Sequence, residues 1–432
     1  MTFFVIAIFL ILAINLISLD VFSFEEDKVT KIHYAGNISP THEKLIKMFN
    51  EQYKGEIKVV PIDLPFTKYS TNEIKELLVK SLRGKSKEID ILAIDRIWTA
   101  RFSKWTEPLD AYFSQEERNK ILKPVYQASK YNGKLASLPM YFDIGILCYR
   151  TDLIKQLDRK SNLESTLKNS ITWRRFIQLG KKWSQISGSS SYYLLAGENF
   201  EGLICNYLEI LYSKGGEYCP KNGNNLLQKD KIKSLKFLKN LIYKYNITPT
   251  KITGFTEVDV YRYALENDIP FFRAWFSNLK DTTLFGEYSY KLDSVKFAPL
   301  PHFQKYSQAR YVYGGWNLVV SKFSRHKKES VKFLKFLMSR KAQKLMFKES
   351  YYLPVIKSLY QDSTIVKNST YKLLEGIINK YGFSRPKYKN YTRISNVVSH
   401  YINQALENKE LSPQKALELA KQSLRSGEII LE

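Results

Sequence analysis

IDILAI, residues 89–94, is a short and mostly apolar run that is typical of a strand buried on both faces of a sheet. A well-marked helix precedes it, because Ser70 and Glu73 form a capping box and Gly84 ends the helical pattern. The apolar face of this helix is expected at Ile74, Leu77, Leu78 and Leu82. A helix that leads into a fully buried strand predicts a parallel sheet flanked by helices, with right-handed crossovers.

The same alternation continues in both directions along the chain. Upstream, strands are predicted at residues 31–35 and 57–62, on either side of a helix at 40–53. Downstream, the run KLASLPMYFDIGILCYR (residues 134–150) is extended and apolar, and a second alternating block follows it. In this block we predict helices at residues 152–157, 172–183, 200–212, 232–245, 258–267, 328–338 and from 413 onward, and strands at 192–195, 294–298 and 316–320. The chain is therefore predicted to have an α/β fold.

Length and charge narrow the class of protein. The 432 residues are many for one compact core, so two domains are expected. Lys and Arg number 67 against 42 Asp and Glu, which gives a formal net charge of +25. The lysines are scattered through the whole chain, and no zinc-knuckle, helix-turn-helix or RNA-recognition signature accompanies them. We interpret the charge as a lysine-rich solvated surface and predict no nucleic-acid binding.

The first residues predict export. Residues 3–14 form an unbroken apolar run of 12, which matches the hydrophobic region of a secretory signal and is too short for a spanning helix. Residues 1–24 are therefore expected to be a signal peptide or, if uncleaved, an N-terminal membrane anchor. No cysteine follows the run closely, so lipoprotein anchoring is not predicted. We expect a periplasmic or other extracytoplasmic location.

Cysteine, histidine and motif patterns exclude several chemistries. Cys205 and Cys219 could close a short disulfide loop beside an unpaired Cys148, or all three could be buried thiols. The five histidines are scattered, so neither a metal nor a cofactor is predicted. The chain also lacks the G-x-S-x-G, HExxH, P-loop and G-x-G-x-x-G motifs, and we predict that it is not an enzyme.

Nine segments, taken in order, carry a family resemblance. They are IDILAIDRIWTARFSKWTEPLD (89–110), NGKLASLPMYFDIGILCYRTDL (132–153), ITWRRFIQLGKKW (171–183), EGLICNYLEILYSKGG (201–216), DIPFFRAWFSNL (268–279), FAPLP (297–301), YGGWNLVVSKFSRHKKESVKFLKFL (313–337), YYLPVIKSLYQD (351–362) and SRPKYKNYTRISN (384–396). Their order and spacing resemble the extracellular solute-binding proteins of family 1, the maltose and trehalose type that serves ABC importers.

This resemblance implies a periplasmic-binding-protein type II fold, in which two hinged α/β lobes enclose a ligand cleft. It places the N-lobe at residues 25–145 plus 316–350 and the C-lobe at 146–315 plus 351–432. A monomer of this type would capture a small di- or oligosaccharide by lobe closure and deliver it to the membrane permease subunits of an ABC importer. A membrane-tethered sensor of the same fold is the alternative.

A sugar-binding site needs carboxylates, which accept hydrogen bonds from the hydroxyl groups, and flat aromatic rings, which stack on the C–H faces of the sugar. Asp95 follows the strand at residues 89–94 at its carboxyl edge, where α/β sheets bind ligands, although it could instead cap a helix. Asp143 lies in the apolar run MYFDIGIL, as a ligand contact or as a hinge residue held by backbone hydrogen bonds. Of the adjacent rings of Tyr141 and Phe142, one is expected to face the cleft and the other to pack.

The remaining candidates come from the resemblance. Trp275 in FFRAWFSN and Trp316 in GGWN match ligand-stacking tryptophans of the family, and Gly314–Gly315 would let the backbone approach the ligand closely. Arg385 in SRP matches a cleft arginine, with a surface arginine as the alternative. Trp98 and Trp105 are predicted to pack. The sequence leaves the sugar unidentified, and its basic charge leaves room for a sugar acid or sugar phosphate.

Overall fold

The computed structural model describes residues 29–157, 163–218, 225–304, 308–366 and 369–426. The predicted signal or anchor segment, residues 1–24, lies outside these ranges, as do Cys219 and residue 427, where the last helix was expected to stop.

The first sheet is built mainly from the N-terminal part of the chain. Its strand order is β2 (Ile57–Asp63), β1 (Thr30–Gly36), β3 (Ile91–Asp95), β12 (Trp316–Val320) and β6 (Leu138–Pro139). β1 pairs in parallel with β2 and β3, as predicted, but β12 is antiparallel to both β3 and β6. The sheet is mixed because β12 re-enters it from the second half of the chain and runs in the opposite direction.

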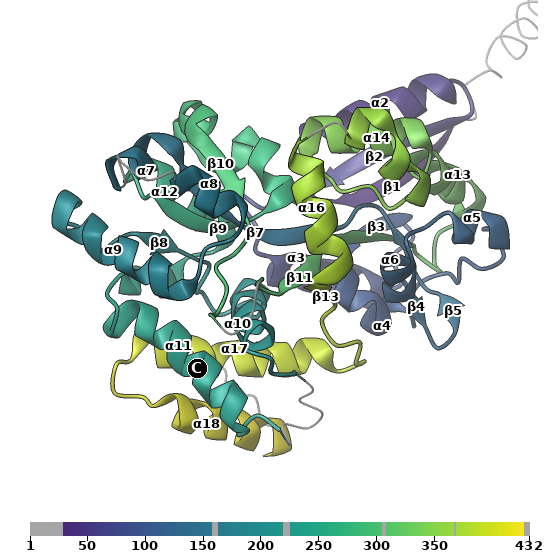
Figure 1. Ribbon diagram of the computed structural model, residues 1–432. Helices are drawn as coiled ribbons and strands as arrows, with labels where there is room; N and C mark the ends of the chain where they lie inside the picture. Colours follow the sequence, from purple (N-terminus) through teal and green to yellow (C-terminus); the bar gives the residue numbers. More distant parts are fainter. Residues whose placement is uncertain (1–28, 158–162, 219–224, 305–307, 367–368, 427–432) are drawn as a thin grey trace, which may run out of the picture.

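Short helices surround this sheet (Figure 1). They are α2 (Pro40–Gln52), α3 (Thr71–Arg83), α4 (Thr99–Phe102), α5 (Gln115–Asn119), α6 (Lys123–Ala128), α13 (Lys327–Leu337) and α14 (Arg340–Ser350). The capping box of Ser70 and Glu73 forms as predicted, and Gly84 follows the last residue of α3. Leu77 is the exception, since 42% of it is exposed. The buried face of α3 passes through Lys75 and Val79, and Leu77 projects away from it.

The second sheet has β7 (Asp143–Arg150) at its centre, with all eight residues buried. Its strand order is β13 (Gly382–Phe383), β11 (Tyr311–Gly314), β7, β9 (Phe271–Trp275) and β8 (Tyr193–Leu194), and β10 (Val295–Ala298) also pairs with β7. The helices around it are α7 (Thr151–Leu157), α8 (Leu163–Lys168), α9 (Trp173–Ser187), α10 (Glu201–Ser213), α11 (Lys229–Tyr243), α12 (Glu257–Glu266), α16 (Ser369–Lys380), α17 (Tyr391–Glu407) and α18 (Pro413–Ser426). In Figure 1, α11, α17 and α18 form the lower layer of this part.

The chain passes between the two sheets at structured segments. It leaves β6 at Pro139 and enters the second sheet at Asp143, and it returns at Gly315, between β11 and β12. After α14 it passes again beside the first crossing, where Phe142 and Leu353 form an isolated antiparallel bridge. The lobe bounds expected from the sequence, 25–145 plus 316–350 and 146–315 plus 351–432, stay a prediction.

Gly315 is required by the contact between two of these crossings. Its φ is +109°, and a Cβ there would lie 2.5 Å from the carbonyl oxygen of Tyr141 and 2.5 Å from the Cα of Phe142. A Cβ on Gly314 would lie 2.6 Å from the Trp275 ring. The Cβ directions of the two glycines are therefore filled by the protein itself. Both residues also line the cavity described below, and their close approach to a ligand stays a prediction.

We expect Gly315→Ala to destabilise the fold more than Gly55→Ala. Gly55 has a similar positive φ of +82°, but a Cβ added there would meet no atom within 4 Å, so it incurs only the backbone cost of about 1 to 2 kcal/mol. At Gly315 the clash with the neighbouring backbone adds roughly 1 to 3 kcal/mol. Thermal unfolding followed by circular dichroism measures the difference, and equal midpoints for the two variants would contradict the packing argument.

Candidate functional site

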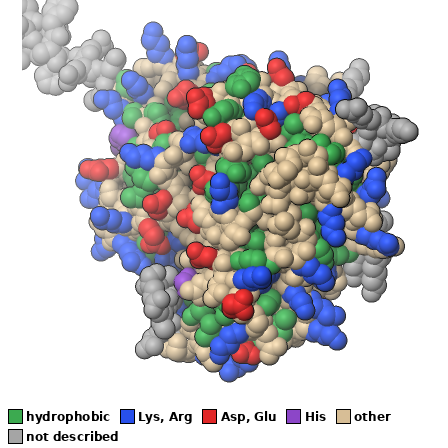
Figure 2. Space-filling model, turned by 90° about the vertical axis from the view of Figure 1, so that its left-hand side faces the viewer, with side chains coloured by type: hydrophobic (Ala, Val, Ile, Leu, Met, Phe, Trp, Pro, Cys, Tyr) green, Lys and Arg blue, Asp and Glu red, His purple; other side chains and the backbone are tan. Residues whose placement is uncertain are grey.

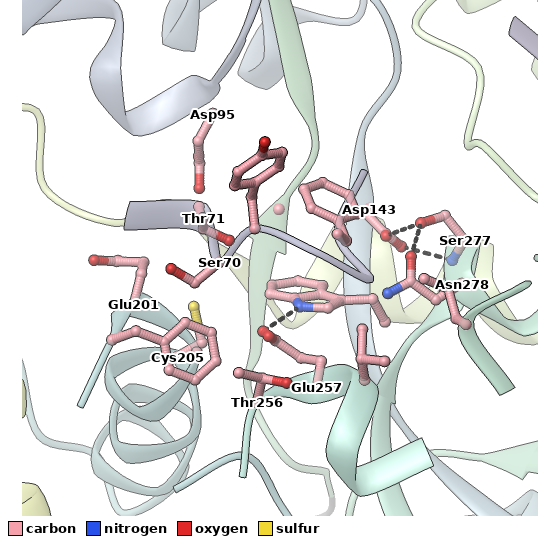
Figure 3. Close-up of a pocket in the computed structure, with 18 of the residues that line it drawn as sticks. Ser70, Thr71, Asp95, Asp143, Glu201, Cys205, Thr256, Glu257, Ser277 and Asn278 are labelled. Carbon is pink, nitrogen blue, oxygen red and sulfur yellow. Dashed lines mark hydrogen bonds between the residues drawn. The ribbon is translucent and has the colours of Figure 1, made fainter. Parts of the chain in front are cut away.

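A cavity of about 390 Å³ lies between the two sheets and is open to solvent. Its lining includes all seven residues proposed from the sequence, namely Asp95, Tyr141, Asp143, Trp275, Gly315, Trp316 and Arg385. Figure 3 shows Asp95 and Glu201 on one side of this space, Asp143 and Ser277 on the other, and Glu257 below. The structure thus brings together segments far apart in the sequence, while the ligand-binding role of each residue stays a prediction.

Asp95 ends β3 and has two partners within the protein. One carboxylate oxygen accepts a hydrogen bond of 3.1 Å from the backbone N–H of Ile97, so Asp95 caps the short helix η1 (Arg96–Trp98). The same carboxylate forms an ion pair of 3.1 Å with Arg385. The two interpretations drawn from the sequence are therefore compatible, because the residue is a helix cap and also lines the cavity.

Arg385 is buried, with 2% of its side chain exposed, so the alternative of a surface arginine is wrong. Its Nη2 lies 3.1 Å from Oδ1 of Asp95, and its Nη1 lies 2.9 Å from Oε1 of Glu201. Burial alone would lower the pKa of Arg385, but the neighbouring carboxylates raise it above the ordinary value. Arg385 therefore stays charged and links the end of β3 in the first sheet to the start of α10.

Glu201 was not singled out in the sequence, although it is the first residue of α10. The hydroxyl of Tyr391 donates to Oε1 of Glu201 at 2.8 Å, and the hydroxyl of Ser395 donates to Oε2. Burial raises the pKa of Glu201, and Arg385 together with these hydrogen bonds opposes the rise. This network attaches α17 to the same side of the cavity.

Asp143 is held by the backbone, as one of the two interpretations expected. The N–H groups of Ile144 and Ser277 donate to Oδ1 at 2.8 and 3.1 Å, and the Ser277 hydroxyl donates to Oδ2. Burial raises the pKa of Asp143 to about 6, although these hydrogen bonds favour the ionised form. The carboxylate fixes the start of β7 against the helix η4 (Phe276–Lys280) and also lines the cavity.

The indole of Trp275 is positioned by charged neighbours. Its Nε1 donates to Oε1 of Glu257 at 3.1 Å, and the guanidinium carbon of Arg273 lies 4.0 Å from the ring centroid. Glu209 holds Arg273 through two hydrogen bonds of 2.9 and 3.3 Å, so the cation is locked beneath the ring. One face of the half-buried ring is therefore occupied, and its orientation at the cavity is fixed.

The second tryptophan of the cavity, Trp316, is also half-buried. It packs edge to face on Trp98, with 5.6 Å between centroids, and lies 5.4 Å from the ring of Phe66. Trp98 is buried, which confirms its predicted packing role, whereas Phe66 lines the cavity and was missed in the sequence.

Tyr141 and Phe142 divide the two roles expected for adjacent rings. Tyr141 lines the cavity and stacks on Tyr352, with 3.9 Å between centroids and 9° between planes. Phe142 packs edge to face against Tyr313 at 6.2 Å, away from the cavity lining. The alternation of side chains along an extended segment separates the two neighbours.

Several acidic lining residues were also missed: Glu73, Glu198, Glu201, Glu257 and Asp259. Three of them, Glu73, Glu257 and Asp259, lie in the first turns of α3 and α12, where acidic residues are common for reasons of helix capping alone. These residues could have been predicted to line the cavity only from the direction in which α3 and α12 point, and this direction is set by the tertiary fold.

Two further expectations can be compared with the described ranges. Cys148 and Cys205 are buried free thiols there, and Cys219, the proposed partner of Cys205, lies outside them. Within those ranges we find no group of three or more metal-ligating side chains and no helix long and apolar enough to cross a membrane.

Comparisons with known proteins agree with this architecture. A family model described as "Bacterial extracellular solute-binding protein" matches residues 35–344. A probable ABC transporter-binding protein from Deinococcus radiodurans is 25% identical over 298 residues, which cover 67% of this chain and 68% of that protein. Maltose-bound MalE3 from T. maritima is 27% identical, with a TM-score of 0.79 over 93% of this chain and 100% of that one.

A more distant solved structure has the same fold. The ABC transporter solute-binding protein of Thermotoga lettingae TMO, bound with α-D-tagatose, is 21% identical, with a TM-score of 0.78 over 92% of this chain and 99% of that one. These matches confirm the expected periplasmic-binding-protein fold. They also agree with the prediction of a solute-binding protein of an ABC transporter and not an enzyme. The family model matches well over half of this chain. The chain therefore belongs to the family of bacterial extracellular solute-binding proteins.

Proposed function

We propose that this protein captures a small carbohydrate in the cavity between its two sheets by lobe closure and delivers it to the permease of an ABC importer. The observation that carries the proposal is the lining of the cavity, where the half-buried rings of Trp275 and Trp316 accompany several carboxylates. Aromatic faces stack on the C–H faces of a sugar, and carboxylates accept hydrogen bonds from its hydroxyl groups. An apolar ligand would displace water from these carboxylates without offering hydrogen-bond donors to their remaining lone pairs.

The positions of the two rings suit a flat, polar ligand. Arg273 lies against one side of Trp275, and Trp98 and Phe66 brace Trp316, so neither ring has to be ordered when a ligand binds. Pre-organised rings reduce the entropy cost of binding. The solved relatives with the same fold, bound to maltose and to tagatose, support a sugar as the ligand class.

Lobe closure is supported by the way the cavity is assembled. Asp95 and Trp316 come from the first sheet, whereas Asp143 and Trp275 come from the second, so a ligand between them contacts both. The crossings beside Gly315 and Asp143 are the segments about which the lobes would move. A ligand that touches both lobes stabilises the closed arrangement by its differential affinity for that state.

A thermal-shift screen over disaccharides, oligosaccharides, polyols and sugar acids tests the function. We expect a sugar to raise the melting temperature and to decrease the radius of gyration measured by small-angle X-ray scattering. The expected dissociation constant is micromolar or below, about −8 kcal/mol, as capture from dilute solution requires. A screen in which amino acids or peptides bind and sugars do not would refute the carbohydrate assignment.

We expect Trp316→Ala to weaken binding of the sugar found in that screen by about 2 kcal/mol, roughly thirtyfold, because the stacking surface is lost. Isothermal titration calorimetry measures the change. Trp105→Ala is the matched control, since Trp105 packs against Phe102 and is absent from the cavity lining. If both variants bind as tightly as the unmodified protein, Trp316 does not stack on the ligand.

Removal of the Arg385 side chain should destabilise the protein. In Arg385→Met the buried carboxylates of Asp95 and Glu201 lose their shared cation, which costs about 3 to 5 kcal/mol. The triple variant with Asp95→Asn and Glu201→Gln should recover part of this loss, because no buried charge is then unpaired. Thermal unfolding of both variants checks the prediction, and a triple variant no more stable than Arg385→Met would contradict it.

A further inference from the structure

Acidic side chains outnumber basic ones in the cavity, although the whole chain carries a formal charge of +25. The acidic members of the lining are Glu73, Asp95, Asp143, Glu198, Glu201, Glu257 and Asp259, and the basic members are Lys68, Arg262 and Arg385. Figure 2 shows a different balance on the outer surface, where Lys and Arg side chains are spread over the visible face. The cavity therefore has a local charge opposite in sign to that of the whole protein.

The basic groups do not neutralise this excess. Both Nη groups of Arg385 are engaged by Asp95 and Glu201, which leaves that set of three with a net negative charge. Lys68 is exposed at the edge of the cavity and lies over the ring of its neighbour Tyr69. Within the described ranges, neither Lys68 nor Arg262 forms an ion pair with a cavity carboxylate.

Glu198 is the carboxylate with most to gain from a cationic ligand. Its side chain makes no hydrogen bond or ion pair with any residue that the structure describes, although it lines the cavity. Burial raises the pKa of Glu198, and the nearby carboxylates of Asp259 and Glu257 raise it further. A positive charge placed beside Glu198 would relieve this repulsion, whereas a negative charge would increase it.

The other carboxylates near Glu198 already have structural partners. Glu73 accepts from the backbone and hydroxyl of Ser70, and Asp259 does the same with Thr256, so each completes a capping box. Glu257 accepts from the indole of Trp275. These contacts hold the negative charges in place around Glu198 without cancelling them, because all the donors are neutral.

We propose that the cavity selects its ligand by charge, so that a sugar with a protonated amino group binds more tightly than its neutral counterpart and a sugar acid binds weakest, with Glu198 as the specificity-determining residue. The site is the whole cavity, and the amino group is recognised at the Glu198 side of it. This inference rests on the proposed function, and it excludes the sugar acids and sugar phosphates that the net charge of the chain left open.

The test uses sugars that differ mainly in charge: glucosamine, glucose and glucuronate, and the corresponding galactosamine, galactose and galacturonate. Titration calorimetry at pH 6.5 with the full protein should give affinities that decrease in the order amine, neutral sugar, acid in the series that binds, with at least a tenfold difference between amine and acid. The ratio should decrease as NaCl is raised, because the discrimination is electrostatic. Equal affinity within a series, or tighter binding of the acid, would overturn the proposal.

A pair of variants assigns the effect to one residue. Glu198→Gln should reduce the ratio of amine to neutral affinity at least threefold, while Glu51→Gln, an exposed glutamate on α2 away from the cavity, should leave it unchanged. An unaltered ratio in Glu198→Gln would remove Glu198 from the proposal. If sugars bind but their affinities do not follow the order amine, neutral sugar, acid, only the charge selection fails. If sugars of every charge fail to bind, the carbohydrate function fails and the charge selection with it.

Discussion

The guanidinium of Arg385 holds two buried carboxylates that come from different parts of the fold. Asp95 ends a strand of the first sheet, and Glu201 begins a helix packed on the second. Neither carboxylate could be buried alone, because an unpaired charge of this kind costs several kcal/mol. The position of the loop after β13, the start of α10 and the packing of α17 therefore depend on one shared cation. The guanidinium of Arg385 therefore determines both the charge network and the shape of this side of the cavity.

The crossings impose a second constraint, which is steric. Gly315 has no room for a Cβ because the backbone of Tyr141 and Phe142 passes directly beside it. Asp143, which follows Phe142 in the chain, fixes the same segment because its carboxylate accepts hydrogen bonds from the backbone N–H groups of Ile144 and Ser277. Two crossings packed this closely would limit the proposed lobe movement to a hinge about them, since sliding would require the backbones to separate.

Much of the fold could be predicted from the sequence, because its signals are local. The capping box and apolar periodicity of α3 depend on residues three and four apart, and the helix begins directly after Ser70, as they indicated. The helix predicted from residue 172 likewise begins there, as α9, with Thr172 as its N-cap. The antiparallel entry of β12 and the exposure of Leu77 could not be predicted in the same way. Both depend on which distant segment packs against the element, and no local pattern records this.

The candidate site shows the same division between local and tertiary information. Trp275, Trp316 and Arg385 were proposed from a family resemblance, and the structure brings them to one cavity. Glu198 and Glu257 were missed, since single acidic residues beside helix starts are common on any protein surface. Their importance arises only when the fold turns those helix ends toward a shared space.

The net charge of the chain illustrates why composition is a poor guide to a ligand. Interactions between solvent-exposed charges are largely screened beyond about 8 Å in physiological salt, so charges on the outer surface have little effect on a ligand enclosed in the cavity. Carboxylates in the lining act at contact distance through a medium less polar than water, where each interaction is several times stronger. The field at the ligand is therefore set by the few groups around the cavity, whatever the sign of the total. The +25 acts instead on what the whole surface meets: solvent, membrane and partner proteins.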